Sequence, residues 1–267
     1  TNRREGWTRN VRLGNRANDE DNMATRVRLA YEPSERFNLD FSADYTVDRA
    51  GGFEQEIKGL QNLGIAPPQP DPSPTEPYRS AANTRGFQDR DVWGVALRGN
   101  YEVAPGIGLT SITSYRGHEF KALRDLDVGP APTLSTGEVE DGHQFSQEFR
   151  LASKGGERFN WLVGVYYFDE ESTRTETWSL GGLLPVTPII LFQGDYIWSF
   201  SGGSKSYAAF SQVDYALTDR LTVVAGLRYS RDKKSGQYFT GSTALLSLPS
   251  FIQPTPGSTG FTSQVSK

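Results

Sequence analysis

The sequence predicts an all-β fold: an antiparallel up-and-down transmembrane β-barrel segment with short turns at one end and long loops at the other. Three observations predict it. Apolar and polar residues alternate in segment after segment. Aromatic residues recur at a fixed spacing inside these segments. Along the chain, short connections between segments alternate with long ones.

The clearest alternating segment covers residues 37–45, where the odd-numbered residues are apolar and the even-numbered residues are polar. Because side chains alternate between the two faces of a strand, this segment has one apolar and one wet face. Seven further segments align with it: residues 23–31, 93–101, 107–115, 143–151, 159–167, 207–215 and 221–229. We therefore expect about eight strands, which form a single partial barrel domain over residues 1–267, a fragment of a larger barrel.

Four of these segments carry aromatic residues eight positions apart. These are Phe37/Tyr45, Trp93/Tyr101, Phe159/Tyr167 and Tyr207/Tyr215. Eight steps of about 3.3 Å make roughly 26 Å of strand. With a tilt of about 40° the height is roughly 20 Å, close to the ~25 Å apolar band of outer-membrane barrels. We interpret the aromatic residues as two interfacial girdles, although aromatic residues also favour ordinary core strands.

The connections sort by length. Short ones cover residues 32–36, 102–106, 152–158 and 216–220, and long ones cover residues 46–92, 116–142 and 168–206. In outer-membrane barrels short turns face the periplasm and long loops face outward, whereas compact soluble domains rarely carry several long loops. The sorting therefore favours the barrel.

Composition excludes several classes of protein. The mean hydropathy is −0.54, and no stretch approaches the roughly 20 apolar residues of a transmembrane helix. A search for long apolar stretches does not detect transmembrane strands, because half of their residues are polar. The net charge is −4 without clusters of lysine and arginine, which argues against nucleic acid as a partner. The absence of cysteine excludes disulfides and thiolate metal sites.

No pattern indicates catalysis or a cofactor. His118 and His143 are the only histidines and lack metal-type spacing. Phosphate-binding and serine-nucleophile motifs are absent. Acidic clusters at residues 19–21, 125–127, 138–141 and 169–171 lack the spacing of a calcium loop, and we interpret them as solvated loops. We expect no enzyme, no metal site and no cofactor.

Several phrases of the sequence are similar to the barrel strands of TonB-dependent receptors. They are RLAYEPSERFNLDFSADYTVDR, HQFSQEFRLAS, RFNWLVGVYYFDE and SYAAFSQVDYALTDRLTVVAGLRYSRDKK, and the opening NRREGWTRN resembles the end of an earlier strand. The resemblance implies a Gram-negative outer-membrane barrel of about 22 strands with an N-terminal plug. It also implies energy-coupled uptake, through the TonB protein, of a scarce bulky nutrient, most often a ferric siderophore. The implied partners are outer-membrane lipid, TonB and the cargo.

The sequence shows no plug, no TonB box and no aromatic-terminated closing strand, so we interpret both ends as points within a longer protein. The polar residues of the alternating segments would face the plug of a receptor, and a solvated face fits them equally. They are Arg26, Arg28, Asp40, Asp44, Arg98, Glu148, Arg150 and Arg228. A passive porin-type barrel and a soluble all-β ligand-binding module remain as alternative functions.

The predicted loop over residues 170–205 is rich in large side chains. Trp178, Phe192, Tyr196, Trp198 and Phe200 lie within it. Water-exposed loops seldom keep such residues without a surface to cover, and aromatic side chains bury much area on a ligand. We predict that Trp178, Tyr196 and Trp198 help to form the external ligand-binding surface. Packing against neighbouring loops, or extension of the strands above the membrane, is the structural alternative.

Overall fold

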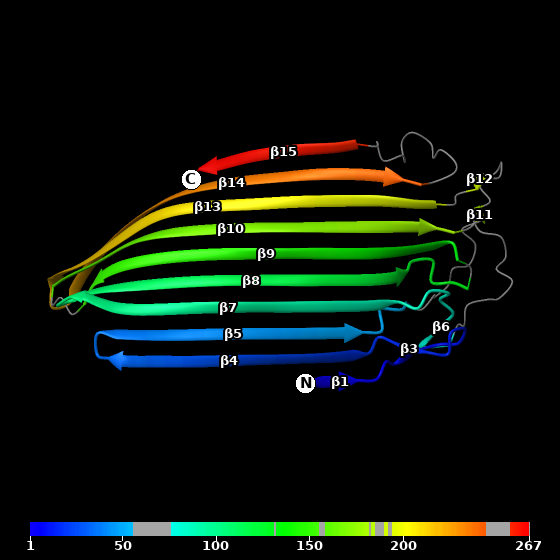
Figure 1. Ribbon diagram of the computed structural model, residues 1–267, viewed down its shortest axis with the longest axis horizontal. Coiled ribbons are helices and arrows are strands. Elements are labelled where there is room, and N and C mark those ends of the chain that lie inside the picture. The colour runs from blue at the N-terminus through cyan, green and yellow to red at the C-terminus, as the bar shows by residue number, and fades with distance from the viewer. Residues whose placement is uncertain are drawn as a thin grey trace.

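The computed structural model describes residues 1–55, 76–130, 132–154, 158–181, 183–184, 190–191, 194–243 and 257–266. Most of them form one antiparallel sheet of ten strands, in which each strand pairs with its neighbours in chain order (Figure 1). In spatial order the strands are β1 (Asn2–Arg4), β4 (Glu20–Ser34), β5 (Phe37–Ala50), β7 (Phe87–Ala104), β8 (Ile107–Asp125), β9 (Leu134–Ser153), β10 (Phe159–Leu180), β13 (Gly194–Thr218), β14 (Leu221–Ser242) and β15 (Gly257–Ser266). No helix within the described ranges is long and apolar enough to cross a membrane.

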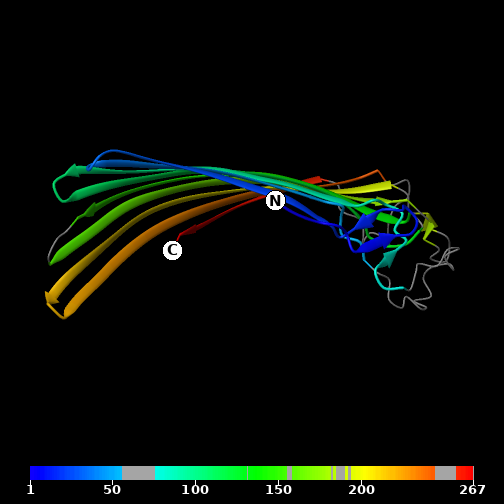
Figure 2. The ribbon, with the colours of Figure 1, turned by 90° about the horizontal axis from the view of Figure 1, so that it is seen from below.

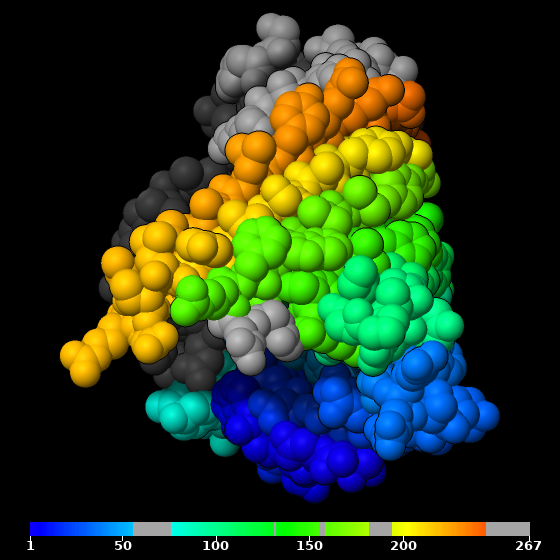
Figure 3. Space-filling view, turned by 90° about the vertical axis from the view of Figure 1, so that its left-hand side faces the viewer, coloured from blue at the N-terminus to red at the C-terminus, as the bar shows by residue number. Residues whose placement is uncertain are grey.

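Each of the eight predicted segments lies inside one long strand of this sheet, from β4 to β14, so the all-β, up-and-down fold is confirmed. The sheet is a single curved layer, and its strands run side by side along the long axis of the molecule (Figures 1 and 2). Short hairpins join strands at one end, here the turn end, which Figure 3 views with the strands in chain order from blue to orange. The long connections gather at the opposite end, here the loop end.

The strand register brings the alternating residues of all eight long strands onto common faces. Directly paired residues share a face, and odd-numbered residues pair with odd-numbered ones away from the turns. We call the odd-numbered side the apolar face and the even-numbered side the polar face. Leu39, Val95, Val163, Val223 and Leu227 all lie on the apolar face. The alternation seen in single segments thus adds up to one continuous amphipathic layer.

The predicted aromatic pairs meet each other across the strands. Near the turn end, Phe37 pairs with Tyr101, with ring centroids 6.4 Å apart. Eight residues away, Tyr45 pairs with Trp93. The aromatic spacing found within single strands is therefore matched between neighbours, as two girdles require.

The girdle nearer the loop end continues across the sheet. The ring centroids of Trp93 and Tyr115 lie 5.3 Å apart, those of Phe145 and Tyr167 6.2 Å apart, and those of Tyr167 and Tyr207 5.1 Å apart. We call this row the upper girdle. It marks the edge of the apolar face on the side of the loop end.

The apolar face is open to its surroundings. Leu227 is 76% exposed, Leu29 60% and Val165 54%, and no second layer of described residues covers them. Water-soluble proteins rarely leave contiguous apolar surface of this extent uncovered. Hydrocarbon is the surrounding that such a face fits.

All three predicted long loops are wrong in extent. Residues 46–92 were expected to form a loop, yet β5 continues to Ala50 and β7 begins at Phe87. Residues 116–142 were expected to form a loop, yet β8 continues to Asp125 and β9 begins at Leu134. Residues 168–206 were likewise expected as a loop, but β10 continues to Leu180 and β13 begins at Gly194. Above the upper girdle both faces are wet, so the strands lose their apolar alternation while the inter-strand hydrogen bonds continue.

The connection between β5 and β7 contains a short strand of its own. Within residues 46–92, β6 (Arg79–Ser80) pairs in parallel with β2 (Thr8–Asn10), which also pairs with β3 (Arg16–Ala17). The opening sequence is thus divided, since β1 pairs with β4 in the main sheet while residues 8–10 belong to this small sheet. β11 (Leu183–Leu184) and β12 (Ile190–Leu191) form a further two-stranded sheet.

Most of the fully buried side chains lie around the small sheet, and several of them are polar. Asn10 Nδ2 donates to the Ala82 carbonyl at 2.9 Å and to the Glu54 carboxylate at 3.3 Å. Asn18 Nδ2 donates to Thr8 Oγ1 at 2.7 Å. Because buried polar groups must find partners, this network fixes the segments that precede β4 and follow β5 at the loop end.

Candidate functional site

The three aromatic residues predicted to bind ligand lie on strands and not on a loop. Trp178 is near the end of β10, and Tyr196 and Trp198 are near the start of β13. Trp178 pairs directly with Tyr196 in the register. All three carry even numbers and therefore occupy the polar face, beyond the upper girdle. Phe192, named with them from the sequence, lies outside the described residues.

Trp178, Tyr196 and Trp198 form one cluster. The ring centroids of Trp178 and Trp198 lie 5.5 Å apart in an edge-to-face arrangement, and those of Tyr196 and Trp198 lie 6.3 Å apart and stacked. Trp178 Nε1 donates to Glu176 Oε1 at 2.8 Å. Tyr196 is 5% exposed, whereas both tryptophans are partly exposed. Such packing fixes the orientation of the two indole rings and leaves part of their surface free for a ligand.

A charged hollow adjoins the aromatic cluster on the same face. It has a volume of about 640 Å³. Its lining consists of Gln88, Arg90, Val92, His118, Phe120, Arg124, Glu138, Glu140 and Arg174. Three arginines and two glutamates therefore share it, and Arg174 connects the hollow to the cluster because its guanidinium lies 3.6 Å from Glu176.

Glu138 is the centre of the charge network in the hollow. It is 6% exposed, and its two carboxylate oxygens contact Arg124 at 3.1 Å and Arg174 at 2.9 Å. Arg90 lies over the ring of Phe120 with its Cζ 5.3 Å from the centroid. An arginine that also stacks on a ring presents its N–H groups edgewise, which suits recognition of an anionic oxygen.

Closer to the middle of the sheet, the polar face is tied by side-chain bonds between strands. Asp44 accepts from Arg116 at 2.9 Å and lies 3.8 Å from Arg26. Asn100 donates to Asn38 at 2.7 Å and accepts from Thr110 at 2.8 Å. The register places all eight residues predicted for the wet face on this side, from Arg26 on β4 to Arg228 on β14.

Sequence reasoning missed the residues of the charged hollow. It read residues 138–141 as an acidic loop, but they lie within β9, and Glu138 and Glu140 point to the polar face. Arg90, Arg124 and Arg174 were not singled out. A signal did exist, because all of these charges occupy even positions in phase with the polar residues nearer the membrane. The predicted strands ended with their last apolar residues, whereas the strands of the structure continue beyond them.

Another acidic pair organises the turn between β8 and β9. The Asp127 carboxylate accepts from the backbone N–H groups of Gly129 at 2.9 Å, Thr133 at 2.9 Å and Leu134 at 2.7 Å. Burial raises the pKa of the Asp125 carboxyl at the loop end of β8. Asp125 Oδ1 accepts from the Val128 N–H at 2.8 Å, so both aspartates bind backbone groups of the turn. No group of three or more potential metal-binding side chains occurs among the described residues.

The comparisons with known proteins agree with this geometry. Residues 5–266 match the family model described as TonB dependent receptor-like, beta-barrel. The ferric yersiniabactin uptake receptor FyuA from Yersinia pestis aligns with 99% of this chain at a TM-score of 0.68 and 19% identity. The siderophore receptor PiuA from Acinetobacter baumannii aligns with 99% of it at a TM-score of 0.60 and 11% identity.

At these identities the solved structures establish the fold alone. This chain covers 37% of the FyuA chain and 40% of the PiuA chain, so it spans well under half the length of either receptor. The family model, in contrast, covers nearly the entire chain. Together with the open apolar face and its aromatic girdles, this match shows that the chain belongs to the TonB-dependent receptor β-barrel family.

Proposed function

We propose that this chain is part of the barrel of an outer-membrane receptor for the energy-coupled uptake of a ferric siderophore, with Trp178, Tyr196 and Trp198 contacting the cargo. One observation carries the proposal. The aromatic cluster and the charged hollow lie side by side on the polar face, beyond the upper girdle. In a closed barrel this position faces the inside of the extracellular mouth, where incoming cargo first meets the protein.

The chemistry of this surface suits a ferric chelate. The two tryptophans offer flat apolar area, and the arginines offer charge-assisted hydrogen bonds to the oxygens of an anionic complex. Glu138 neutralises part of the positive charge and holds Arg124 and Arg174 in place. Named cargo of the similar structures supports the same class of ligand, because FyuA takes up ferric yersiniabactin and PiuA is a siderophore receptor.

Coupling to TonB is proposed for the full receptor. This chain covers 37% of the FyuA chain and 40% of the PiuA chain, and it would form a similar fraction of that receptor. A passive porin-type barrel is the alternative. Uptake through a porin follows the concentration gradient and does not need TonB. The two functions therefore separate when uptake of the same ferric siderophore is measured in cells with and without TonB.

The test of the cargo surface uses the full-length receptor with Trp178, Tyr196 and Trp198 all replaced by alanine. Ferric yersiniabactin and ferric citrate serve as probes, and quenching of tryptophan fluorescence measures binding. Loss of the cluster should weaken binding of the recognised chelate at least about tenfold, or about 1.4 kcal/mol. Trp7, Trp93 and Trp161 of this chain remain as reporters in the triple variant.

Phe239→Ala is the matched control. Phe239 pairs with Ser199, so it lies at the height of the aromatic cluster but on the apolar side of the sheet. Its replacement should leave binding unchanged. Unchanged affinity in the triple variant, or loss of barrel assembly together with binding, would show that the cluster has a structural role and does not contact the cargo.

A further inference from the structure

The imidazole of His118 lies between the charged hollow and a smaller cavity nearer the upper girdle. His118 lines the hollow, and it also lines this cavity of about 70 Å³, whose lining includes Arg116, Glu170 and Glu171. Its direct partner on β9 is Gly142, and a Cβ there would lie 2.6 Å from His118 Cε1. The ring therefore has its place because Gly142 lacks a side chain.

The contact with Glu140 decides how the ring of His118 can meet a ligand. His118 Nε2 lies 3.0 Å from Glu140 Oε1, and the imidazole is 38% exposed. Because an ionised carboxylate only accepts hydrogen bonds, we assign the proton of the neutral ring to Nε2, which leaves a lone pair on Nδ1. Protonation turns Nδ1 from an acceptor into a donor and adds one positive charge to the ring.

The fixed charges of the hollow balance each other. Its guanidinium groups and the carboxylates beside them belong to Arg90, Arg124, Arg174, Glu138, Glu140 and Glu176. With a neutral imidazole these charges cancel, so a protonated His118 leaves one positive charge in excess. On the other side of the ring, Arg116 is paired with Asp44 at 2.9 Å, and Glu170 and Glu171 are exposed. The charge state of His118 therefore decides the net charge of the hollow.

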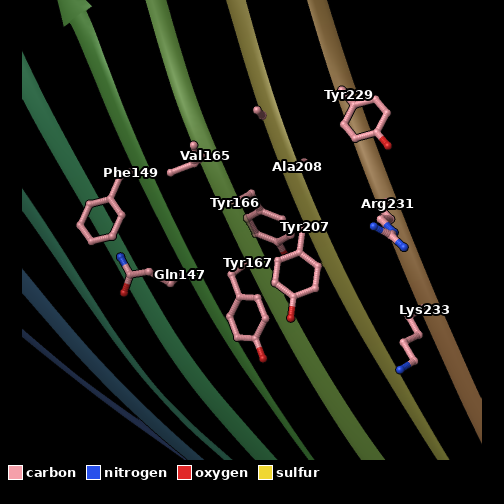
Figure 4. Close-up of a pocket in the computed structure, with 11 residues that line it drawn as sticks. Gln147, Phe149, Val165, Tyr166, Tyr167, Tyr207, Ala208, Tyr229, Arg231 and Lys233 are labelled. Atoms are coloured by element: carbon pink, nitrogen blue, oxygen red, sulfur yellow. The ribbon is translucent and has the colours of Figure 1, made fainter. Parts of the chain in front are cut away.

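His143, the only other histidine of the chain, lies on the opposite face. It borders the small cavity, but it pairs with Gly117 and therefore belongs to the apolar side of the sheet. Its ring centroid is 6.0 Å from that of Tyr115 in the upper girdle, and Figure 4 shows Tyr167 and Tyr207 of the same row side by side. The two histidines thus differ in the face to which they belong, which makes His143 a control for His118.

We propose that His118 sets the charge preference of the cargo site, so that the protonated ring favours ferric chelates with negatively charged carboxylate groups and the neutral ring does not. Histidine is the side chain whose charge ordinarily changes between pH 5 and 8. An anionic oxygen gains a charge-assisted hydrogen bond from the protonated ring, whereas a neutral chelate gains little from the added charge. The inference rests on the proposed function, because it requires that cargo reaches the charged hollow.

The test measures binding of anionic ferric citrate to the purified full-length receptor at pH values from 5 to 8, by quenching of tryptophan fluorescence. His118→Gln keeps a donor for Glu140 but cannot titrate. At pH 5 the unmodified receptor should bind ferric citrate about tenfold more tightly than this variant does, or by about 1.4 kcal/mol, and at pH 8 the two should bind alike. Both proteins meet the same chelate at each pH, so the titration of citrate itself cancels in the comparison.

Two further variants separate charge from structure. His118→Lys carries a positive charge throughout this pH range, so at pH 8 it should bind ferric citrate about tenfold more tightly than the unmodified receptor does. His143→Gln is the matched control and should reproduce the pH profile of the unmodified receptor. Equal weakening of His118→Gln at all pH values would show a structural role for the ring and overturn the proposal, and so would a changed pH profile in His143→Gln.

Should the His118 variants fail to assemble, the unmodified receptor decides alone through a second probe, the neutral ferric trihydroxamate ferrichrome. Its preference for ferric citrate over ferrichrome should grow as the pH falls, although citrate itself gains protons, and a constant or falling preference would overturn the proposal. Binding of a ferric siderophore without this pH dependence would contradict the role of His118 alone. A receptor that binds none of ferric citrate, ferrichrome and ferric yersiniabactin would contradict the proposed function as well.

Discussion

An arginine in the middle of the apolar face is the sharpest test of how this sheet lies in the membrane. Val163 occupies that position on β10, four residues from Phe159 and four from Tyr167. Each aromatic row is therefore roughly 13 Å away along the strand. Arginine on the lipid face of a barrel costs about 2–4 kcal/mol at the midplane and roughly 0–1 kcal/mol near the interfaces. Val163→Arg should therefore lower the free energy of unfolding by about 2–4 kcal/mol.

Leu162→Arg provides the matched comparison. Leu162 is the neighbouring residue on the same strand, and its pairing with Gln212 places it on the polar face. The same side chain at the same depth should then be tolerated at a cost of less than about 1 kcal/mol. Denaturant titration of the full-length receptor in lipid vesicles gives both values. Equal costs at the two positions would refute the assignment of faces.

Cysteine labelling checks the same assignment without a stability measurement. Cysteines at Leu39 and Leu227 should react with a lipid-phase reagent, because both residues lie on the apolar face. Cysteines at Asp40 and Arg228 should not, since the register turns them to the polar face. Similar labelling of the two pairs would contradict the barrel orientation.

Three further predictions concern local packing and the edges of the sheet. A Cβ on Gly164 would lie 2.3 Å from the Phe210 ring, so Gly164→Ala should destabilise the receptor by about 1–3 kcal/mol, and Phe210→Ala should relieve part of that loss in a double-mutant cycle. Asp127→Ala should speed hydrogen exchange of the Gly129 and Leu134 amides, since a net hydrogen bond is worth about 1 kcal/mol, and unchanged protection would exclude its role in the turn. The 267-residue chain expressed alone should aggregate or require detergent, because β1 and β15 leave unpaired edges in the described sheet, whereas a soluble monomer that melts cooperatively would favour the ligand-binding module.

The candidate site was only partly predictable from the sequence. Trp178, Tyr196 and Trp198 stood out because large aromatic side chains are unusual in a wet segment, and the structure brings them together. Their role in binding cargo stays a prediction. Glu138 and its arginine partners did not stand out, because charged residues in a wet segment carry no distinctive pattern until the pairing of β8, β9 and β10 is known.

The small sheet at the loop end shows the same limit. Asn10 and Glu54 are 44 residues apart, and nothing local in either segment indicates that they meet in a buried network. The sequence predicts the end of an earlier strand for residues 2–10 and a long loop for residues 46–92, which contains Glu54. Burial of these side chains depends on contacts between distant segments, which the sequence pattern does not encode.

The sequence by itself determined the strands, their faces and the aromatic rows. Alternation with a period of two is a local property, and hydrocarbon imposes it on every strand that crosses the apolar band. Tertiary structure alone decided how far the strands continue beyond that band and which charges pair on the polar face. Where a strand extends into water, both of its faces are polar, and its sequence shows no alternation. Its length and its partners are then defined only by the hydrogen bonds between strands.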